Sequence, residues 1–183
     1  MPETFIFSLS KLIFTGPKYL KNIYLILKTK SLVFVIQLMR RTDDTSLPLV
    51  RMAMDAAALI PKAANELNVS DATDALVNAG AIQIAKKMIA AASELLVPPS
   101  NSDEAVVVAA CGLVASISRA KGGLARGAAL DAGLMHPLFA LLPGGRSHGG
   151  SNPKLCLAAA RALLAMTSRN DRACVDVAIR CDC

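Results

Sequence analysis

Tryptophan is absent from this chain of 183 residues, and aromatic residues of all kinds make up only 4% of it. Proteins that stack single-stranded nucleic acid on aromatic side chains, and β-sandwiches with an aromatic core, are therefore disfavoured. Alanine is absent before Ala53, and the first 41 residues hold a single acidic side chain, Glu3. Hydrophobic residues reach 54% of the chain, which excludes global disorder.

The formal net charge of +6 belongs to one end of the chain. Seven of the 20 lysine and arginine residues lie in residues 1–41, whereas residues 42–183 hold 13 basic and 13 acidic side chains. A neutral body has no electrostatic reason to bind polyanions. We therefore expect no nucleic-acid partner.

The breaks in charge and in alanine content coincide, and they predict three parts. These are a basic, apolar and helical N-terminal segment over residues 1–41, a polar linker over 42–48, and a repetitive body over 49–180. The longest uncharged apolar run of the first part is Ser31–Met39, nine residues, whereas a membrane-spanning helix needs about 20. The segment is therefore not a transmembrane span. A targeting peptide, a membrane-surface helix and an ordinary packed helix pair remain open interpretations.

A short motif recurs in the body. Residues 74–82 and 127–135 each run from a short apolar helix through Asn/Asp-Ala-Gly into a second apolar segment, and residues 172–179 form a weaker copy without the glycine. The aligned polar positions are Asn78, Asp131 and Asp176. We predict that Gly80 and Gly133 end their short helices in the left-handed conformation, which lets the next helix pack at a sharp angle.

Hydrophobic periodicity and turn residues predict two complete three-helix units, at about residues 71–119 and 124–168. Their second helices are expected over 81–97 and 134–142, and their third helices over 104–119 and 154–168. Pro153 is expected in the first turn of the last of these. An earlier third helix begins at Leu47, and Pro61 is predicted to end it or kink it. No strand pattern competes, so the fold class is all-α.

These motifs resemble the armadillo repeat family. The segment Gly133-Leu-Met-His-Pro-Leu-Phe-Ala-Leu-Leu142 is similar to the family's second-helix motif, and Gly80-Ala-Ile82 matches its start. Ala109–Ser118 and Ala158–Thr167 are similar to its third helix. The resemblance implies a right-handed superhelical solenoid whose third helices line a concave face that binds extended peptides or partner proteins.

The resemblance also suggests where a partner would bind. Family members that recognise basic nuclear-localisation peptides carry a Trp and Asn ladder on the third helices. Gly112, Ser116, Arg161 and Ala165 stand at those positions here, so we expect no import-receptor activity, and Arg161 favours an acidic or polar partner group. The predicted partner-binding surface comprises Val108, Gly112, Ser116, Leu157, Arg161 and Ala165.

No residue pattern indicates catalysis, a cofactor or a metal. Cys111, Cys156 and Cys174 occupy apolar helical positions, which predicts buried thiols. Cys181 and Cys183 have no His or Cys cluster at zinc spacing beside them. His136 and His148 lack a nucleophile partner in sequence. We therefore predict that the chain is not an enzyme.

The function expected from these patterns is a non-catalytic protein–protein interaction module or scaffold in the cytoplasm, where an odd cysteine count suits reducing conditions. Two units are fewer than the usual minimum of about three, so we expect a fragment or short form of a longer repeat protein that self-associates through uncapped ends. The alternative is a membrane-associated or organelle-targeted adaptor, in the mitochondrion for example, that uses residues 1–41.

Overall fold

The computed structural model describes residues 31–41, 47–67, 71–94, 101–121, 125–143 and 152–168, with short helical turns at 174–175 and 178–179. Every element in these ranges is a helix, so the all-α prediction is confirmed. The helices are α3 (Ser31–Met39), α4 (Leu47–Leu67), α5 (Asp71–Asn78), α6 (Ala81–Glu94), α7 (Asn101–Ser118), α8 (Ala125–Asp131), α9 (Met135–Ala140) and α10 (Pro153–Thr167).

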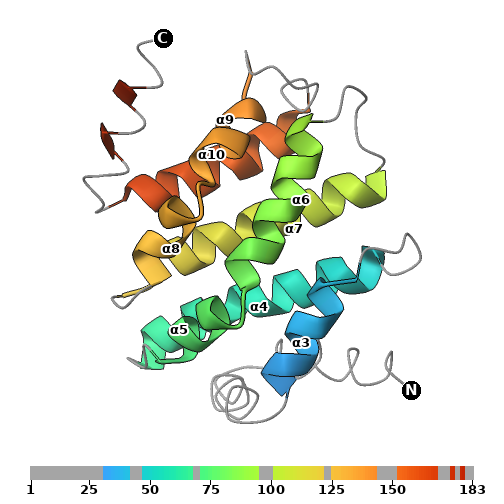
Figure 1. Cartoon of the computed structure of the whole chain (residues 1–183), viewed down its shortest axis with the longest axis vertical. Helices are drawn as coiled ribbons and strands as arrows, with labels where there is room; N and C mark the ends of the chain where they lie inside the picture. Colours follow the sequence, from blue (N-terminus) through green and yellow to red (C-terminus); the bar gives the residue numbers. More distant parts are fainter. Residues whose placement is uncertain are drawn as a thin grey trace.

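The three long helices α4, α7 and α10 form one layer. They lie side by side and run in the same direction, with α7 between the other two (Figure 1). The shorter helices cover one side of this layer, where α3 packs on α4, α6 and α8 pack on α7, and α8 and α9 pack on α10. This arrangement leaves the opposite side of the long helices available to solvent wherever their side chains are not buried.

Two glycine turns link the short helices to their successors, and both have the predicted left-handed backbone. Gly80 has a φ of 89° and Gly133 a φ of 74°. In each turn the glycine N–H donates to a carbonyl three residues back, that of Val77 at 2.9 Å and that of Leu130 at 2.8 Å. The two turns are therefore built alike, and each ends its short helix while leaving few backbone groups unpaired.

Alanine sets the spacing of the core. Ala57, Ala85, Ala110 and Ala159 are fully buried on α4, α6, α7 and α10, where a methyl group lets helix backbones approach closely. Larger side chains fill the space between the layers. Those with essentially no exposed surface include Leu76, Ile89, Leu113, Ile117, Leu134, Leu138 and Leu155. At about 25 cal/mol per Å² of apolar surface, this burial is the main force that holds the helices together.

Pro61 does not end α4, contrary to one form of the sequence prediction. The helix continues to Leu67 with Pro61 inside it. A proline within a helix removes one hydrogen bond and costs about 3 kcal/mol. Pro61 is itself buried, and Ala57, Ile60, Ala63 and Ala64 around it belong to the core. Packing along the whole of α4 therefore outweighs the lost bond.

The compositional boundary near residue 41 does not separate two cores. Val35, Ile36, Leu38 and Met39 of α3 are buried in the same cluster as α4 and α7. Because α4 begins at Leu47, the last two residues of the predicted linker over 42–48 are helical. Residues 1–30 and 42–46, on which the rest of the N-terminal prediction depends, lie outside the described residues.

Candidate functional site

The middle helix, α7, exposes a single narrow strip along its described length. Most of its side chains are buried by α4, α6, α8 and α10. From Ala105 onward the partly or fully exposed positions follow one another at intervals of three or four residues, namely Ala105, Val108, Gly112 and Ser116, with Glu104 next to the first and Arg119 one residue beyond the helix. A helix places residues at this spacing on one face. Three predicted binding residues, Val108, Gly112 and Ser116, therefore share this strip.

A groove of about 460 Å³ lies between the N-terminal halves of the three long helices. Its floor is apolar and built from small residues of α7, Ala105, Val108 and Ala109. Its remaining lining is charged, with Arg51 and Asp55 from α4, Glu104 from α7 and Lys154 from α10. The groove thus offers an apolar contact surface flanked by charges of both signs.

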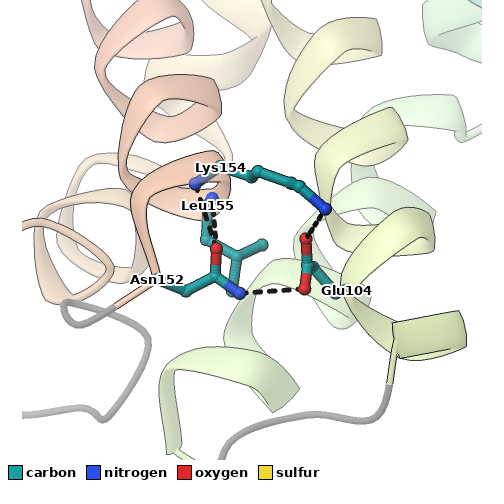
Figure 2. A network of polar contacts seen from close by, with 4 residues as sticks. All are labelled: Glu104, Asn152, Lys154 and Leu155. Carbon is teal, nitrogen blue, oxygen red and sulfur yellow. Dashed lines mark hydrogen bonds and ion pairs between the residues drawn. The ribbon is translucent and has the colours of Figure 1, made fainter.

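One side of the groove is fixed by a network around the Asn152 amide (Figure 2). Its oxygen accepts from the backbone N–H groups of Lys154 at 3.0 Å and Leu155 at 3.4 Å, which caps α10. Its nitrogen donates to Glu104 Oε2 at 2.9 Å. Because the oxygen is occupied by backbone donors, only the nitrogen can face the carboxylate. One amide therefore joins the start of α10 to the first turn of α7.

Glu104 is the buried end of this network. Its side chain is 12% exposed, and its Oε1 lies 3.3 Å from Lys154 Nζ, whose side chain is 80% exposed. The position of Glu104 in the first turn of α7 favours a negative charge, because the helix dipole is positive there. An ion pair with so exposed a lysine contributes little to stability. The Asn152 hydrogen bond is therefore the contact that holds Glu104 in place.

A second ion pair lines the α4 side of the groove. Arg51 Nε lies 3.6 Å from Asp55 Oδ2, one helical turn away, and both side chains are more than half exposed. Partial burial raises the pKa of Asp55 above its ordinary value of 3.8, and the Arg51 guanidinium opposes that shift only in part. Because both side chains are largely exposed, each can also form a polar contact with a bound molecule.

The far end of α7 is also tied by an asparagine. Asn65, near the end of α4, donates from Nδ2 to the carbonyl oxygen of Arg119 at 3.3 Å and accepts from the N–H of Lys121 at 2.8 Å. These bonds satisfy backbone groups just beyond the last turn of α7. Since Asn152 holds the first turn and Asn65 the last, the exposed strip of α7 is fixed relative to both neighbouring helices.

The predicted residues of α10 divide into exposed and buried. Leu157 and Arg161 are exposed as expected, but Ala165 is 1% exposed and belongs to the core. The prediction for Ala165 is corrected, because this position of α10 packs against the protein interior and its methyl group offers no surface to a partner. Of the three aligned polar positions of the repeat motif, Asn78 and Asp131 are the last residues of α5 and α8. The third, Asp176, lies outside the described residues.

Of the groove residues only Val108 was predicted from sequence, although a signal exists for two of the charged ones. Glu104 stands one turn before Val108 on the α7 strip, and Lys154 stands two turns before Arg161 on α10. Extending the predicted surface backwards at helical spacing would have reached both residues. Arg51 and Asp55 carried no such signal, because the surface prediction included no residue of α4.

The cysteines do not all follow the prediction of buried thiols. Cys111 is buried, and burial raises its pKa to about 12. Cys156 is half-buried, and its thiol donates to the carbonyl oxygen of Leu141 at 3.3 Å. Cys174 is exposed, which corrects the prediction, and its thiol donates to the carbonyl oxygen of Thr167, the last residue of α10, at 3.3 Å. Cys181 and Cys183 lie outside the described residues.

The described part of the chain contains no group of three or more His, Cys, Asp or Glu side chains arranged to hold a metal ion. No helix within the same ranges combines the length and apolar character that crossing a bilayer requires. His136 is exposed on α9, and His148 lies outside the described residues. The groove and the α7 strip are thus the candidate site.

No protein-family model, no curated protein and no solved structure matches the chain.

Proposed function

We propose that this chain is a non-catalytic protein-interaction module that binds a segment of a partner protein on the solvent side of α4, α7 and α10. The proposed binding face comprises the groove and the α7 strip from Val108 to Ser116. Among the described helices, the shorter ones pack on the other side of the layer, so they leave this face uncovered (Figure 1). The proposal keeps Val108, Gly112 and Ser116 of the sequence prediction and adds the charged groove lining.

The main support for the proposal is the exposed position of Gly112 within α7. It lies within α7, is exposed, and a Cβ atom built on it would meet nothing within 4 Å. A glycine inside a helix costs roughly 0.5–1 kcal/mol relative to alanine. The fold gains no contact in return for that cost. Close approach of another backbone is a use of glycine that explains such a position.

The surroundings of Gly112 support the same proposal. The groove floor one turn away consists of small apolar residues, and its walls supply donors and acceptors from Arg51, Asp55 and Lys154. A narrow apolar floor between polar walls suits an extended segment, because side chains fill the floor while the walls satisfy backbone groups. Binding sites of this kind are apolar with a few placed polar groups.

The finer architecture belongs to the proposal as well. Two left-handed glycine turns and three parallel long helices support an armadillo-type solenoid, with the long helices as the third helices of successive units. A cytoplasmic location, a longer parent protein and self-association through repeat ends remain predictions from the sequence.

A pair of substitutions at Gly112 tests the proposal. Gly112→Phe fills the open space above the strip with a ring, whereas Gly112→Ala adds only a methyl group to the same helix position. We expect capture of proteins from cell extract by the tagged full chain to be weakened by Gly112→Ala and lost with Gly112→Phe, with both variants folded. Capture at the wild-type level by both variants would show that no partner approaches the strip.

A further inference from the structure

A separate line of exposed side chains runs along α10. Leu157 is 52% exposed and Leu164 is 64% exposed, although both are large and apolar. They are seven residues apart, which places them two turns apart on one face, about 10 Å along the axis. Arg161 is exposed between them on the same face. We refer to Leu157, Arg161 and Leu164 as the α10 stripe.

The stripe lies at the edge of the layer of long helices. α4 packs on α7 and α7 packs on α10, whereas the remaining neighbours of α10 are the short helices α8 and α9. Figure 1 shows α10 as the last of the three parallel helices. The α4–α7 and α7–α10 packing could therefore continue by one more helix beside α10. A helix at this position would cover both leucines.

The positive charge of α10 restricts which kind of partner helix can bind beside it. The helix has no acidic residue, and Arg161 forms no ion pair within the described part of the chain. Lys154, the other cation of α10, is paired with Glu104. A partner that covers the leucines must therefore place a carboxylate opposite Arg161, because covering an unpaired guanidinium with apolar groups is costly.

The same charge disfavours a second copy of this chain as the occupant. Arg161 lies within one residue of the midpoint between Leu157 and Leu164. When two α10 helices pair through their stripes, parallel or antiparallel, the two arginines meet near the centre. Like charges at the centre of a contact oppose association.

We propose that the α10 stripe binds an amphipathic helix of a partner protein, with two apolar residues two turns apart and an acidic residue between them. This inference rests on the proposed function and names the chemistry of the partner at one edge of the binding face. The partner helix extends the layer formed by α4, α7 and α10. Its apolar residues cover Leu157 and Leu164. Its carboxylate pairs with Arg161, whose planar guanidinium can donate two parallel hydrogen bonds to it.

A displayed library of helical 16-residue peptides, selected on the immobilised full chain, tests this inference. We expect the enriched peptides to share apolar residues seven positions apart with Asp or Glu three or four positions from one of them. A synthetic copy of the most enriched peptide then serves as the probe for fluorescence anisotropy. Arg161→Glu should weaken its binding at least tenfold, and Arg161→Lys, which keeps the charge but loses the fork, should weaken it less.

Two controls separate binding from folding. Lys62→Glu makes the same charge reversal at an exposed position of α4 and should leave probe binding unchanged. Leu164→Gln removes an apolar group that is already mostly exposed, so it should weaken binding without lowering the thermal midpoint. Circular dichroism melting of each variant verifies that the fold is intact.

Several results would overturn the inference. They are an absence of enrichment, enriched peptides without an acidic residue, and equal probe binding by the wild type and Arg161→Glu. A wild-type dimer by light scattering that Leu164→Gln dissociates would make a second copy the occupant. Peptides that bind independently of Arg161 but are blocked by Gly112→Phe would leave the proposed function standing and remove this inference alone.

Discussion

The Asn152 side chain donates a hydrogen bond to Glu104 Oε2 at 2.9 Å while its oxygen caps α10. The two residues are 48 positions apart in sequence, and each stands at the start of a long helix. The contact fixes the relative position of α7 and α10 beside the groove, and with it the wall formed by Glu104 and Lys154. The geometry of the candidate site therefore depends on a neutral amide.

Replacing Asn152 tests that dependence. Asn152→Ala removes both the cap and the bond to Glu104, and should lower the free energy of unfolding by about 1–2 kcal/mol. Asn152→Asp keeps the cap but places a second carboxylate against Glu104, so it should also destabilise the protein at pH 7 and recover near pH 4. Urea unfolding measures both, with Asn78→Ala as an exposed control. Wild-type stability of Asn152→Asp at pH 7 would refute the network.

Glycine to alanine substitutions should have opposite effects at two positions. Gly112→Ala places a methyl group in open space within a helix, and should raise the free energy of unfolding by about 0.5–1 kcal/mol. Gly133→Ala forces a φ of 74° on an L side chain, and should lower it by about 1–2 kcal/mol. Thermal melting of the two variants shows whether each substitution raises or lowers stability. A loss of stability in Gly112→Ala would mean that the fold itself requires that glycine.

Thiol reactivity should distinguish Cys111 from Cys174. Burial raises the pKa of Cys111 to about 12 and shields the thiol, whereas Cys174 is exposed. Iodoacetamide at pH 8 should therefore label Cys174 in the native protein and Cys111 only after unfolding, because the thiolate is the reactive form. Mass spectrometry of the two peptides over time measures the rates. Similar native rates at both positions would contradict the packing of α7.

The pKa of Asp55 predicts a small pH effect of defined sign. Partial burial raises this pKa in the folded protein, so the folded state binds more protons than the unfolded state just above pH 3.8. The contribution of Asp55 to stability is then full below pH 3.8 and is lost as the pH rises through the folded value. The wild type should gain stability relative to Asp55→Asn as the pH falls through that range. Thermal melting of both proteins from pH 3 to pH 7 measures this difference in stability. A wild type that loses stability relative to Asp55→Asn on acidification would contradict the raised pKa of Asp55.

The sequence predicts the helices better than it predicts the site. Gly80 and Gly133 stop their helices through a local backbone preference, and Asn152 with Pro153 starts α10 through local capping, so each could be inferred from neighbouring residues. Pro61 misled the prediction for α4, because the burial that offsets its cost comes from other helices.

The groove needed information that no single segment carries. Glu104 and Asn152 approach one another only because α7 and α10 are parallel and in register, and Asp55 joins them from a third helix. Ala165 shows the opposite error: the family resemblance assigned it to the same surface as Arg161, but its side chain faces the protein interior. Helix positions follow from local sequence, whereas the faces they expose follow from packing.

Site-specific photo-cross-linking tests the central claim most directly. A benzophenone amino acid in place of Arg119 stands at the exposed end of the α7 strip, next to the proposed binding face and away from Gly112, and the same residue in place of Ala75 reports on the exposed side of α5. In cells that express the full chain, we expect a defined partner protein to be cross-linked at position 119 and not at position 75. No adduct at position 119, or the same adducts at both positions, would contradict the proposed binding face.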